Sequence, residues 1–366
     1  MKIQQLCRLR NTLMLILLLS LTGTLSSANT KQTIHALYIP LADHYAALIA
    51  YERYRHKMVH ADFKIEKMGS WDLLRAYFQS GGADMAFVMA PLAMDMYREK
   101  PNFRWIGLMH RDGNALAINE LLNQQVKLPK SRQDRLPTPA VANALKKNFQ
   151  SNNKAIQIGV PHTLSTHSVV LYKYLKEHGV SLSISTNKPA EVLAITVAPP
   201  KAPAFIKSRS NRAELSAFEQ SLPWADIVET QNAGHIAWYS KDVIPWPKGH
   251  VECIALAHDQ VIEHKFSATK EVMHYIRQAG SDIEHARLEG GEALNKIIEM
   301  IRKHIPEHSA EAITASLNPA LKVINYQHLN IDKAGLRHIM KLAVEGNIIP
   351  EAIDINAFAD TRFDAE

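Results

Sequence analysis

The sequence predicts an α/β fold of two lobes, each with a mixed, mainly parallel sheet flanked by helices. From residue 33 onward, short apolar runs alternate with amphipathic segments, which is typical of parallel strands covered by helices. With 366 residues, of which 46% are hydrophobic, the chain is long enough to form two lobes with sizeable cores.

The first part of the chain alternates strand and helix. Ser70 is expected to cap a helix that has Asp72 in its first turn and that stops at Gly81 and Gly82. Another helix should begin at Ala90-Pro91, since proline is tolerated in a first turn. We expect strands over residues 34–39, 63–68, 83–89 and 103–109, helices over 45–55 and 71–78, and a turn over 110–114 before a short strand over 115–118.

The middle of the chain changes character. Residues 124–153 are polar and basic and contain three prolines, which predicts an irregular excursion with one short helix over 141–149. A strand over 156–160 should end at Pro161, and Ser165 or Thr166 should cap a helix that stops at Gly179. The remaining predicted elements are strands over 196–198, 236–239 and 252–257 and helices over 202–209, 268–280, 291–303 and 331–345.

This order of elements predicts how the lobes divide the chain. We expect residues 29–120 and 255–366 to form a discontinuous first lobe. Residues 121–254, including the excursion over 124–153, should form the second lobe.

The N-terminus predicts export. Three basic residues precede the apolar run 13–19, and Ser26-Ser27-Ala28 provides small residues for a signal peptidase, so we expect cleavage after Ala28 and a periplasmic protein. Cys7 lies before the apolar run, where it cannot be the acylated cysteine of a lipoprotein. Cys253 is then the one cysteine of the mature chain, and its apolar neighbours predict a small buried residue.

Charge and motifs argue against several function classes. Removal of Lys2, Arg8 and Arg10 with the signal lowers the formal charge from +6 to +3, and no basic stripe indicates nucleic-acid binding. The 18 histidines show no H-E-x-x-H spacing, so we expect no metal site. No nucleophile elbow, phosphate loop or dinucleotide fingerprint is present, and we therefore expect no cofactor and no catalysis.

Polar turns recur after the predicted strands. In open α/β sheets, ligands bind outside the carboxyl ends of the strands, so two facing lobes should form a cleft lined by these turns. Trp71 and Trp224 could equally belong to the core, and Gly113 and Asn114 could be turn formers only. The candidate ligand-binding residues are Asp43, His44, Ser70, Trp71, Pro91, Gly113, Asn114, His162, Ser165, Thr166, His167 and Trp224.

Eight short motifs, in order along nearly the whole mature chain, resemble the periplasmic solute-binding proteins of the nitrate/sulfonate/bicarbonate (NitT/TauT, NMT1-like) class of ABC transporters. The resemblance implies a type II periplasmic-binding-protein fold that closes on a ligand and delivers it to a membrane permease and ATPase. The motifs include Gly69-Ser70-Trp71, Gly82-Ala83-Asp84, Ala90-Pro91-Leu92, His110-Arg111-Asp112-Gly113, Leu164-Ser165-Thr166-His167 and Leu222-Pro223-Trp224.

The resemblance also implies a ligand class. Trp71, Gly113 with Asn114, and His167 match the positions that hold the anion in nitrate-binding relatives, and a small oxyanion bound by a monomer is our expectation. Ser221-Leu222 departs from the glycine-glutamate pair of many relatives, which puts nitrate and bicarbonate in doubt. A ligand-presenting sensor or accessory subunit and a pyrimidine-synthesis enzyme of the same fold remain alternatives.

Overall fold

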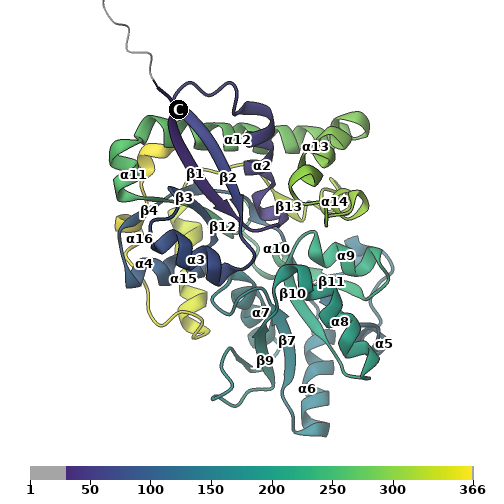
Figure 1. Cartoon of the computed structure of the whole chain (residues 1–366). Helices are drawn as coiled ribbons and strands as arrows, with labels where there is room; N and C mark the ends of the chain where they lie inside the picture. Colours follow the sequence, from purple (N-terminus) through teal and green to yellow (C-terminus); the bar gives the residue numbers. More distant parts are fainter. Residues whose placement is uncertain (1–29, 365–366) are drawn as a thin grey trace, which may run out of the picture.

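The protein consists of two lobes joined by crossing segments, as a computed structural model describes for residues 30–364 (Figure 1). The predicted signal peptide over residues 1–28, with its cleavage site after Ala28, lies outside the described residues. Within residues 30–364, no helix combines the length and the apolar character that a membrane crossing needs.

The first lobe contains a five-stranded mixed sheet in the order β2-β1-β3-β12-β4. β1 pairs in parallel with β2 and β3, whereas β12 runs antiparallel to both β3 and β4. Every residue of β3 and β12 is buried, as their apolar composition predicts. The strands are β1 (Gln32–Tyr38), β2 (Ala61–Lys67), β3 (Met85–Met89), β4 (Phe103–Leu108) and β12 (Cys253–His258).

Helices flank this sheet, and α12 packs along α2 and α13 (Figure 1). Ser70 caps α3 as predicted, because its side chain accepts a hydrogen bond from the Leu73 N–H. α15 contacts α4 and also α7 of the second lobe. The elements are η1 (Ala42–His44), α2 (Tyr45–Tyr54), α3 (Trp71–Gln79), α4 (Ala90–Glu99), α11 (Asp259–His264), α12 (Phe266–Glu289), α13 (Gly291–His304), α14 (Ala310–Ser316), α15 (Lys333–Glu345), α16 (Ile355–Phe358) and η4 (Thr361–Phe363).

The second lobe contains a six-stranded sheet in the order β11-β6-β10-β7-β9-β8. β6 runs antiparallel to β10 and β11, and the other neighbouring pairs are parallel. The strands are β6 (Asn114–Ile118), β7 (Ile156–Val160), β8 (Leu182–Ser183), β9 (Val192–Thr196), β10 (Ala217–Ser221) and β11 (His235–Tyr239).

The helices of the second lobe correct the predicted excursion over 124–153. Val141 and Leu145 are buried on one face of a 13-residue helix, α6, so packing makes this stretch more regular than its prolines suggested. The elements are α5 (Glu120–Val126), η2 (Arg132–Asp134), α6 (Ala140–Asn152), α7 (Thr166–Glu177), η3 (Pro199–Lys201), α8 (Ala202–Asn211), α9 (Trp224–Thr230) and α10 (Ser240–Val243).

The strand predictions need two further corrections. The predicted strand over 196–198 is wrong, because the strand is β9 and ends at Thr196. β10 was not predicted, since Glu219, Gln220 and Ser221 are polar although all are buried in the sheet.

The sheets place the first crossing between β4 and β6, earlier than the predicted boundary after residue 120. β12, which returns to the first lobe, begins at Cys253 rather than after the boundary predicted at residue 254. β5 (Arg111–Asp112) lies at the first crossing and pairs with β13 (Ile324–Asn325) in a separate two-stranded sheet.

Candidate functional site

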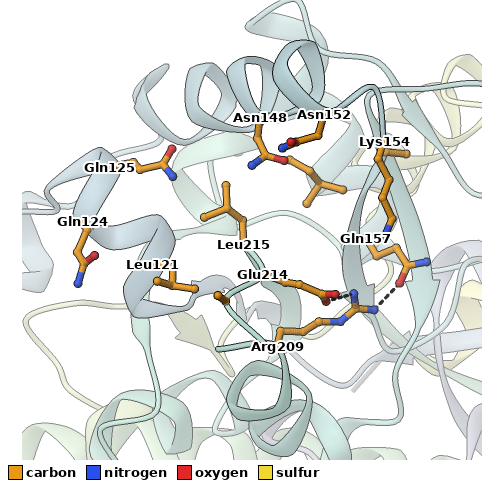
Figure 2. A pocket seen from close by; sticks show the side chains of 13 residues that line it. Leu121, Gln124, Gln125, Asn148, Asn152, Lys154, Gln157, Arg209, Glu214 and Leu215 are labelled. Atoms are coloured by element: carbon orange, nitrogen blue, oxygen red, sulfur yellow. Dashed lines mark hydrogen bonds and ion pairs between the residues drawn. The ribbon is translucent and has the colours of Figure 1, made fainter. Parts of the chain in front are cut away.

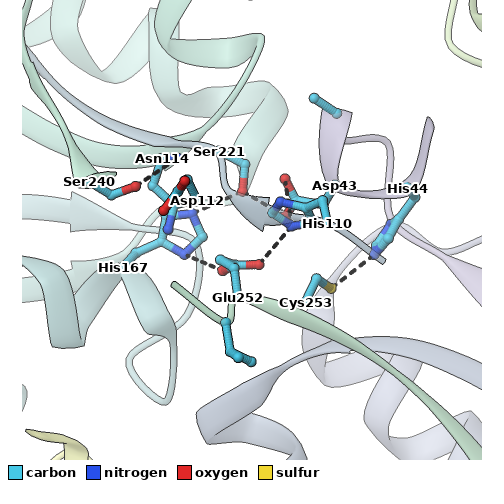
Figure 3. Close-up of polar contacts among 12 residues, drawn as sticks. Asp43, His44, His110, Asp112, Asn114, His167, Ser221, Ser240, Glu252 and Cys253 are labelled. Carbon is cyan, nitrogen blue, oxygen red and sulfur yellow. Dashed lines mark hydrogen bonds and ion pairs between the residues drawn. The ribbon is translucent and has the colours of Figure 1, made fainter. Parts of the chain in front are cut away.

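A buried group of polar side chains lies where the two lobes meet, and Figure 3 shows most of its members facing one another. The first lobe contributes from η1 and from the ends of β4 and β12, and the second lobe contributes from α7 and β10. We call this group the interlobe cluster, and it consists of Asp43, His44, His110, His167, Glu219, Ser221, Glu252 and Cys253, all with fully buried side chains.

Local chain geometry brings these side chains to the interface. The Ser165 side chain accepts from the Ser168 N–H at 3.0 Å and caps α7, which places His167 in the first turn of the helix. Ser221 is the last residue of β10 and is followed by a turn with a cis Leu222–Pro223 peptide bond. Glu252 directly precedes β12, and its carbonyl oxygen accepts from Ala90 N at 2.9 Å.

A hydrogen-bonded chain crosses between the lobes within the cluster. Ser221 donates through its hydroxyl to Oδ2 of Asp43 at 2.9 Å. The Ser221 oxygen therefore accepts from Nε2 of His167, which lies 2.9 Å away, and this assigns the His167 proton to Nε2. The other ring nitrogen, Nδ1, faces Oε1 of Glu252 at 3.6 Å.

His110 carries the positive charge of the cluster. Its Nε2 lies 3.0 Å from Oε2 of Glu252 and 3.6 Å from Oδ1 of Asp43. Burial alone would lower the pKa of His110, but the two carboxylates raise it to about 10. Burial alone would raise the pKa of Asp43, but the positive charge of His110 lowers it below its usual value. His110 and Asp43 are therefore both ionised at neutral pH.

Apart from Glu252, the other titratable groups of the cluster are uncharged at neutral pH. Burial lowers the pKa of His44 to about 4 and that of His167 to about 3. Burial and the nearby Asp43 charge raise the pKa of Glu252 to about 7, and burial raises that of Glu219 well above its usual range. The cluster thus holds three carboxyl groups and one cationic imidazole, with no excess positive charge.

Further contacts join the lobes around the cluster. The Trp224 indole N–H donates to the Pro40 carbonyl oxygen at 2.9 Å. Nε2 of His162 lies 3.2 Å from Oδ1 of Asp72 in α3. The Ser316 hydroxyl of α14 donates to Asp226 of α9. The described lobes are therefore in a closed arrangement.

The predicted site residues fall into two groups. Asp43, His44 and His167 belong to the interlobe cluster, and Thr166 is close enough to Glu252 to lower the pKa of that carboxyl. Asn114 is buried, with both polar atoms of its side chain unpartnered. Gly113 has a φ of +95°, and a side chain there would meet Nδ1 of His110 at 3.0 Å.

The remaining predicted residues support the interface without joining the cluster. The Trp71 ring packs against His44, with the ring centroids 6.1 Å apart. Pro91 lies buried in the first turn of α4. Ser70 and Ser165 cap helices, and His162 and Trp224 make the interlobe contacts given above.

Sequence reasoning missed five members of the cluster: His110, Glu219, Ser221, Glu252 and Cys253. Two of them left a readable signal, because Glu252 and Glu219 are carboxyl groups placed among apolar residues of strand-like segments. A charged group in such a segment indicates a specific partner or a ligand. His110 was read only as part of a turn and of a family-like motif, without a role in binding.

The cluster brings together four side chains that can ligate a metal. One ligand atom each from Asp43, His110, Glu252 and Cys253 lies within 4.8 Å of all the others. We expected no metal site because the histidines show no local ligand spacing, and these four residues come from three segments far apart in the sequence, where such a spacing cannot reveal them.

A separate hollow of about 600 Å³ opens on the second lobe, and Figure 2 shows its amide-rich lining. Arg209 lies at one side, where it pairs with Glu214 at 2.7 Å and hydrogen-bonds Gln157. None of the predicted site residues lines this hollow.

Comparison with known families and structures gives consistent results. The model of the family described as NMT1-like matches residues 27–298. No curated protein sequence matches the chain.

Solved structures share the fold at low sequence identity. The periplasmic nitrate-binding protein NrtA from Synechocystis PCC 6803 is 16% identical with a TM-score of 0.73, over 91% of this chain and 87% of that one. A ligand-binding component of an ABC-type import system from Staphylococcus aureus, with zinc bound, is 16% identical with a TM-score of 0.70, over 91% and 98%. The desulfurization enzyme DSZB is 9% identical with a TM-score of 0.56, over 91% and 97%. The predicted two-lobe periplasmic-binding-protein fold is therefore confirmed, and it is a fold that also occurs in an enzyme.

Proposed function

The chain belongs to the NMT1-like family, and on this premise we propose that it is an extracytoplasmic solute-binding protein that captures a small polar ligand and delivers it to an ABC importer. The interlobe cluster is the observation that carries the proposal. It joins polar side chains of both lobes in a fully buried position, where lobe closure would surround a ligand.

Unpartnered polar atoms support a ligand at this interface. Oδ1 of Asp43, Nδ1 of His110 and both polar atoms of the Asn114 side chain are buried without a hydrogen bond. Such atoms are uncommon in native proteins because each one costs desolvation free energy. A ligand that bonds to them would recover this free energy in the closed state.

The charges of the cluster favour a different ligand class from the oxyanion that the sequence suggested. The positive charge of His110 is already compensated by Asp43 and Glu252. An ionised Glu219 would repel a bound anion, so an anionic ligand would require the Glu219 carboxyl to stay protonated, as its raised pKa allows. A ligand that is positively charged or rich in hydrogen-bond donors suits three carboxyl groups better.

We propose binding rather than catalysis. A reactive cysteine needs a lowered pKa, whereas burial raises the pKa of the Cys253 thiol well above its usual range. His44 and His167 are neutral and held by hydrogen bonds to Ile39 and Ser221.

The cellular setting follows from the same proposal. The signal peptide would be removed after Ala28, and the mature monomer would act in the periplasm. The closed lobes would then dock on a membrane permease that works with an ATPase. A sensor that presents its ligand to a membrane partner would use the same closed state.

Mass spectrometry of protein purified without denaturation tests the proposal by identifying a co-purified ligand. We expect one small polar molecule or ion per chain, and its addition should raise the Tm of ligand-free protein. A panel of nitrate, nitrite, sulfonates and phosphonates tests the oxyanion class in the same assay. Uptake of the ligand that is lost on gene deletion supports transport, whereas unchanged uptake contradicts it.

A further inference from the structure

Four metal-ligating side chains of the interlobe cluster converge from three separate segments. Asp43 comes from η1, His110 from the residues after β4, and Glu252 and Cys253 from the start of β12. Figure 3 shows the side chains of Asp43, His110 and Glu252 directed at one another, with Cys253 beside them. All four are fully buried, and Oδ1 of Asp43 has no hydrogen-bond partner.

The distances suit a tetrahedral ion. Zinc bonds of about 2.0–2.3 Å place neighbouring ligand atoms about 3.3–3.8 Å apart. Nε2 of His110 lies 3.6 Å from Oδ1 of Asp43 and 3.0 Å from Oε2 of Glu252. The largest separation in the set stays within 4.8 Å, about 1 Å longer than the spacing expected around a bound zinc ion.

The types of ligand atom select the ion. One thiol sulfur, one imidazole nitrogen and two carboxylate oxygens form a set typical of Zn²⁺ and similar transition metals. Ca²⁺ and Mg²⁺ take oxygen ligands and would leave the sulfur and the imidazole unused.

Outer contacts hold two of these ligands in place. Nε2 of His44 lies 3.2 Å from Sγ of Cys253, and Nδ1 of the same ring lies 2.8 Å from the Ile39 carbonyl oxygen and 3.0 Å from the Ile39 nitrogen. These contacts fix the His44 ring beside the sulfur and so position Cys253. Ser221 holds Oδ2 of Asp43, which leaves Oδ1 directed at His110.

The Ser221 contact links the metal ligands to the second lobe. Ser221 lies in β10 and is itself held by His167, whereas the four ligands belong to the first lobe and its crossing strands. Lobe closure therefore completes the outer contacts around the ligand set.

We propose that Asp43, His110, Glu252 and Cys253 bind one zinc-class divalent ion, which is the ligand around which the lobes close. This inference rests on the proposed function and names its ligand class. Binding displaces the proton of the Cys253 thiol and the proton that His110 carries on Nε2.

Cobalt absorption tests the site directly. Co²⁺ is added to chelator-treated mature protein, and sulfur-to-cobalt charge transfer is followed in the near ultraviolet. Because Cys253 is the one cysteine after residue 28, such a band can arise from this residue alone. We expect one Co²⁺ per chain and displacement of the band by Zn²⁺.

Variants assign the ligands. Cys253→Ser should abolish the band, Asp43→Asn should weaken binding at least about 100-fold, and Ser221→Ala about 10-fold. Ser216→Ala is the matched control for Ser221→Ala, since the Ser216 hydroxyl lies outside the cluster and is buried without a hydrogen bond. Circular dichroism checks that each variant folds. The cobalt band of the wild-type protein tests the site even if a variant fails to fold.

The outcomes separate the two proposals. Absence of a cobalt band in wild-type protein, or binding that survives Cys253→Ser and Asp43→Asn, overturns the metal site. If an organic ligand then co-purifies and drives closure, the proposed solute-binding function stands. A third outcome is that Co²⁺ binds through Cys253, but zinc does not close the lobes in small-angle scattering and its uptake does not depend on the gene. In that case the proposed transport function is wrong and the metal site stands.

Discussion

Ser221 of the second lobe donates a 2.9 Å hydrogen bond to Oδ2 of Asp43 in the first lobe. Both residues are fully buried, so the bond forms only where the lobes meet and exclude water. The same hydroxyl accepts from His167, which makes Ser221 the middle of a three-residue chain across the interface.

Ser221→Ala should favour an open arrangement of the lobes. The substitution leaves an Asp43 oxygen buried without its partner, which costs about 1–3 kcal/mol in the closed state. Small-angle scattering should show a larger radius of gyration. Ser216→Ala is the matched control, because the Ser216 hydroxyl is buried without a hydrogen bond, and an equal expansion in this variant would contradict the prediction.

Trp224→Phe should weaken the interface by about 1 kcal/mol, since it removes the hydrogen bond to the Pro40 carbonyl and retains an aromatic ring. Trp71→Phe provides the comparison, because the Trp71 indole N–H is buried without a partner. Urea unfolding of both variants measures the difference. A cost at Trp71 as large as that at Trp224 would show that ring size, not the hydrogen bond, determines the effect.

His308 should make the protein sensitive to acid. Burial lowers the pKa of His308 to about 3, although the Asp43 charge acts in the opposite direction and the Lys67 charge adds to the lowering. The ring packs against Trp224 and bonds to the Tyr45 hydroxyl at 2.8 Å. The folded state therefore keeps this imidazole neutral where the unfolded chain would protonate it.

The consequence is a loss of stability as the pH falls from about 6.5 towards 3, by at most about 2 kcal/mol at pH 5. His308→Gln should be less stable than wild type at pH 7, and this difference should shrink at pH 5. His274→Gln, at an exposed position, controls for loss of an imidazole. Parallel unfolding curves at the two pH values measure the effect, and a constant difference between wild type and His308→Gln would contradict it.

Gly113→Ala should destabilise the crossing between the lobes and weaken ligand binding. The φ of +95° costs an alanine about 1–2 kcal/mol, and the new methyl group would press on Nδ1 of His110 at 3.0 Å. Gly69→Ala is the matched control, since no atom lies within 4 Å of its added carbon. Thermal melts and ligand titrations of both variants measure the difference, and equal behaviour would remove the proposed role of Gly113.

The sequence predicted much of the fold because most elements have local signals. Ser70 and Ser165 cap the helices that were expected to follow them. The apolar run in β3 predicted a buried strand. Local signals of this kind depend on a few neighbouring residues, so they can be read without knowledge of the tertiary structure.

The site was harder to predict because two of its members are carboxyl groups in segments whose other residues predict buried, apolar strands. Glu219 in β10 and Glu252 before β12 are carboxyl groups in buried strand regions, where apolar residues are expected. The role of Glu252 becomes clear only when His110 and His167 reach it from distant segments. Cys253 was correctly predicted to be buried, but its contact with His44 depends on the tertiary fold.

The position of β12 between β3 and β4 also has a consequence for the order of assembly. β4 pairs with β12 in the sheet of the first lobe, and β12 follows the whole second lobe in the chain. Until residue 258 is available, β3 lacks its neighbour on one side and β4 cannot join the sheet. The second sheet, from Asn114 to Tyr239, is continuous in sequence and needs no later strand. We expect this half to become structured first and the N-terminal half to be completed last, since pairings that span a long stretch of chain form slowly.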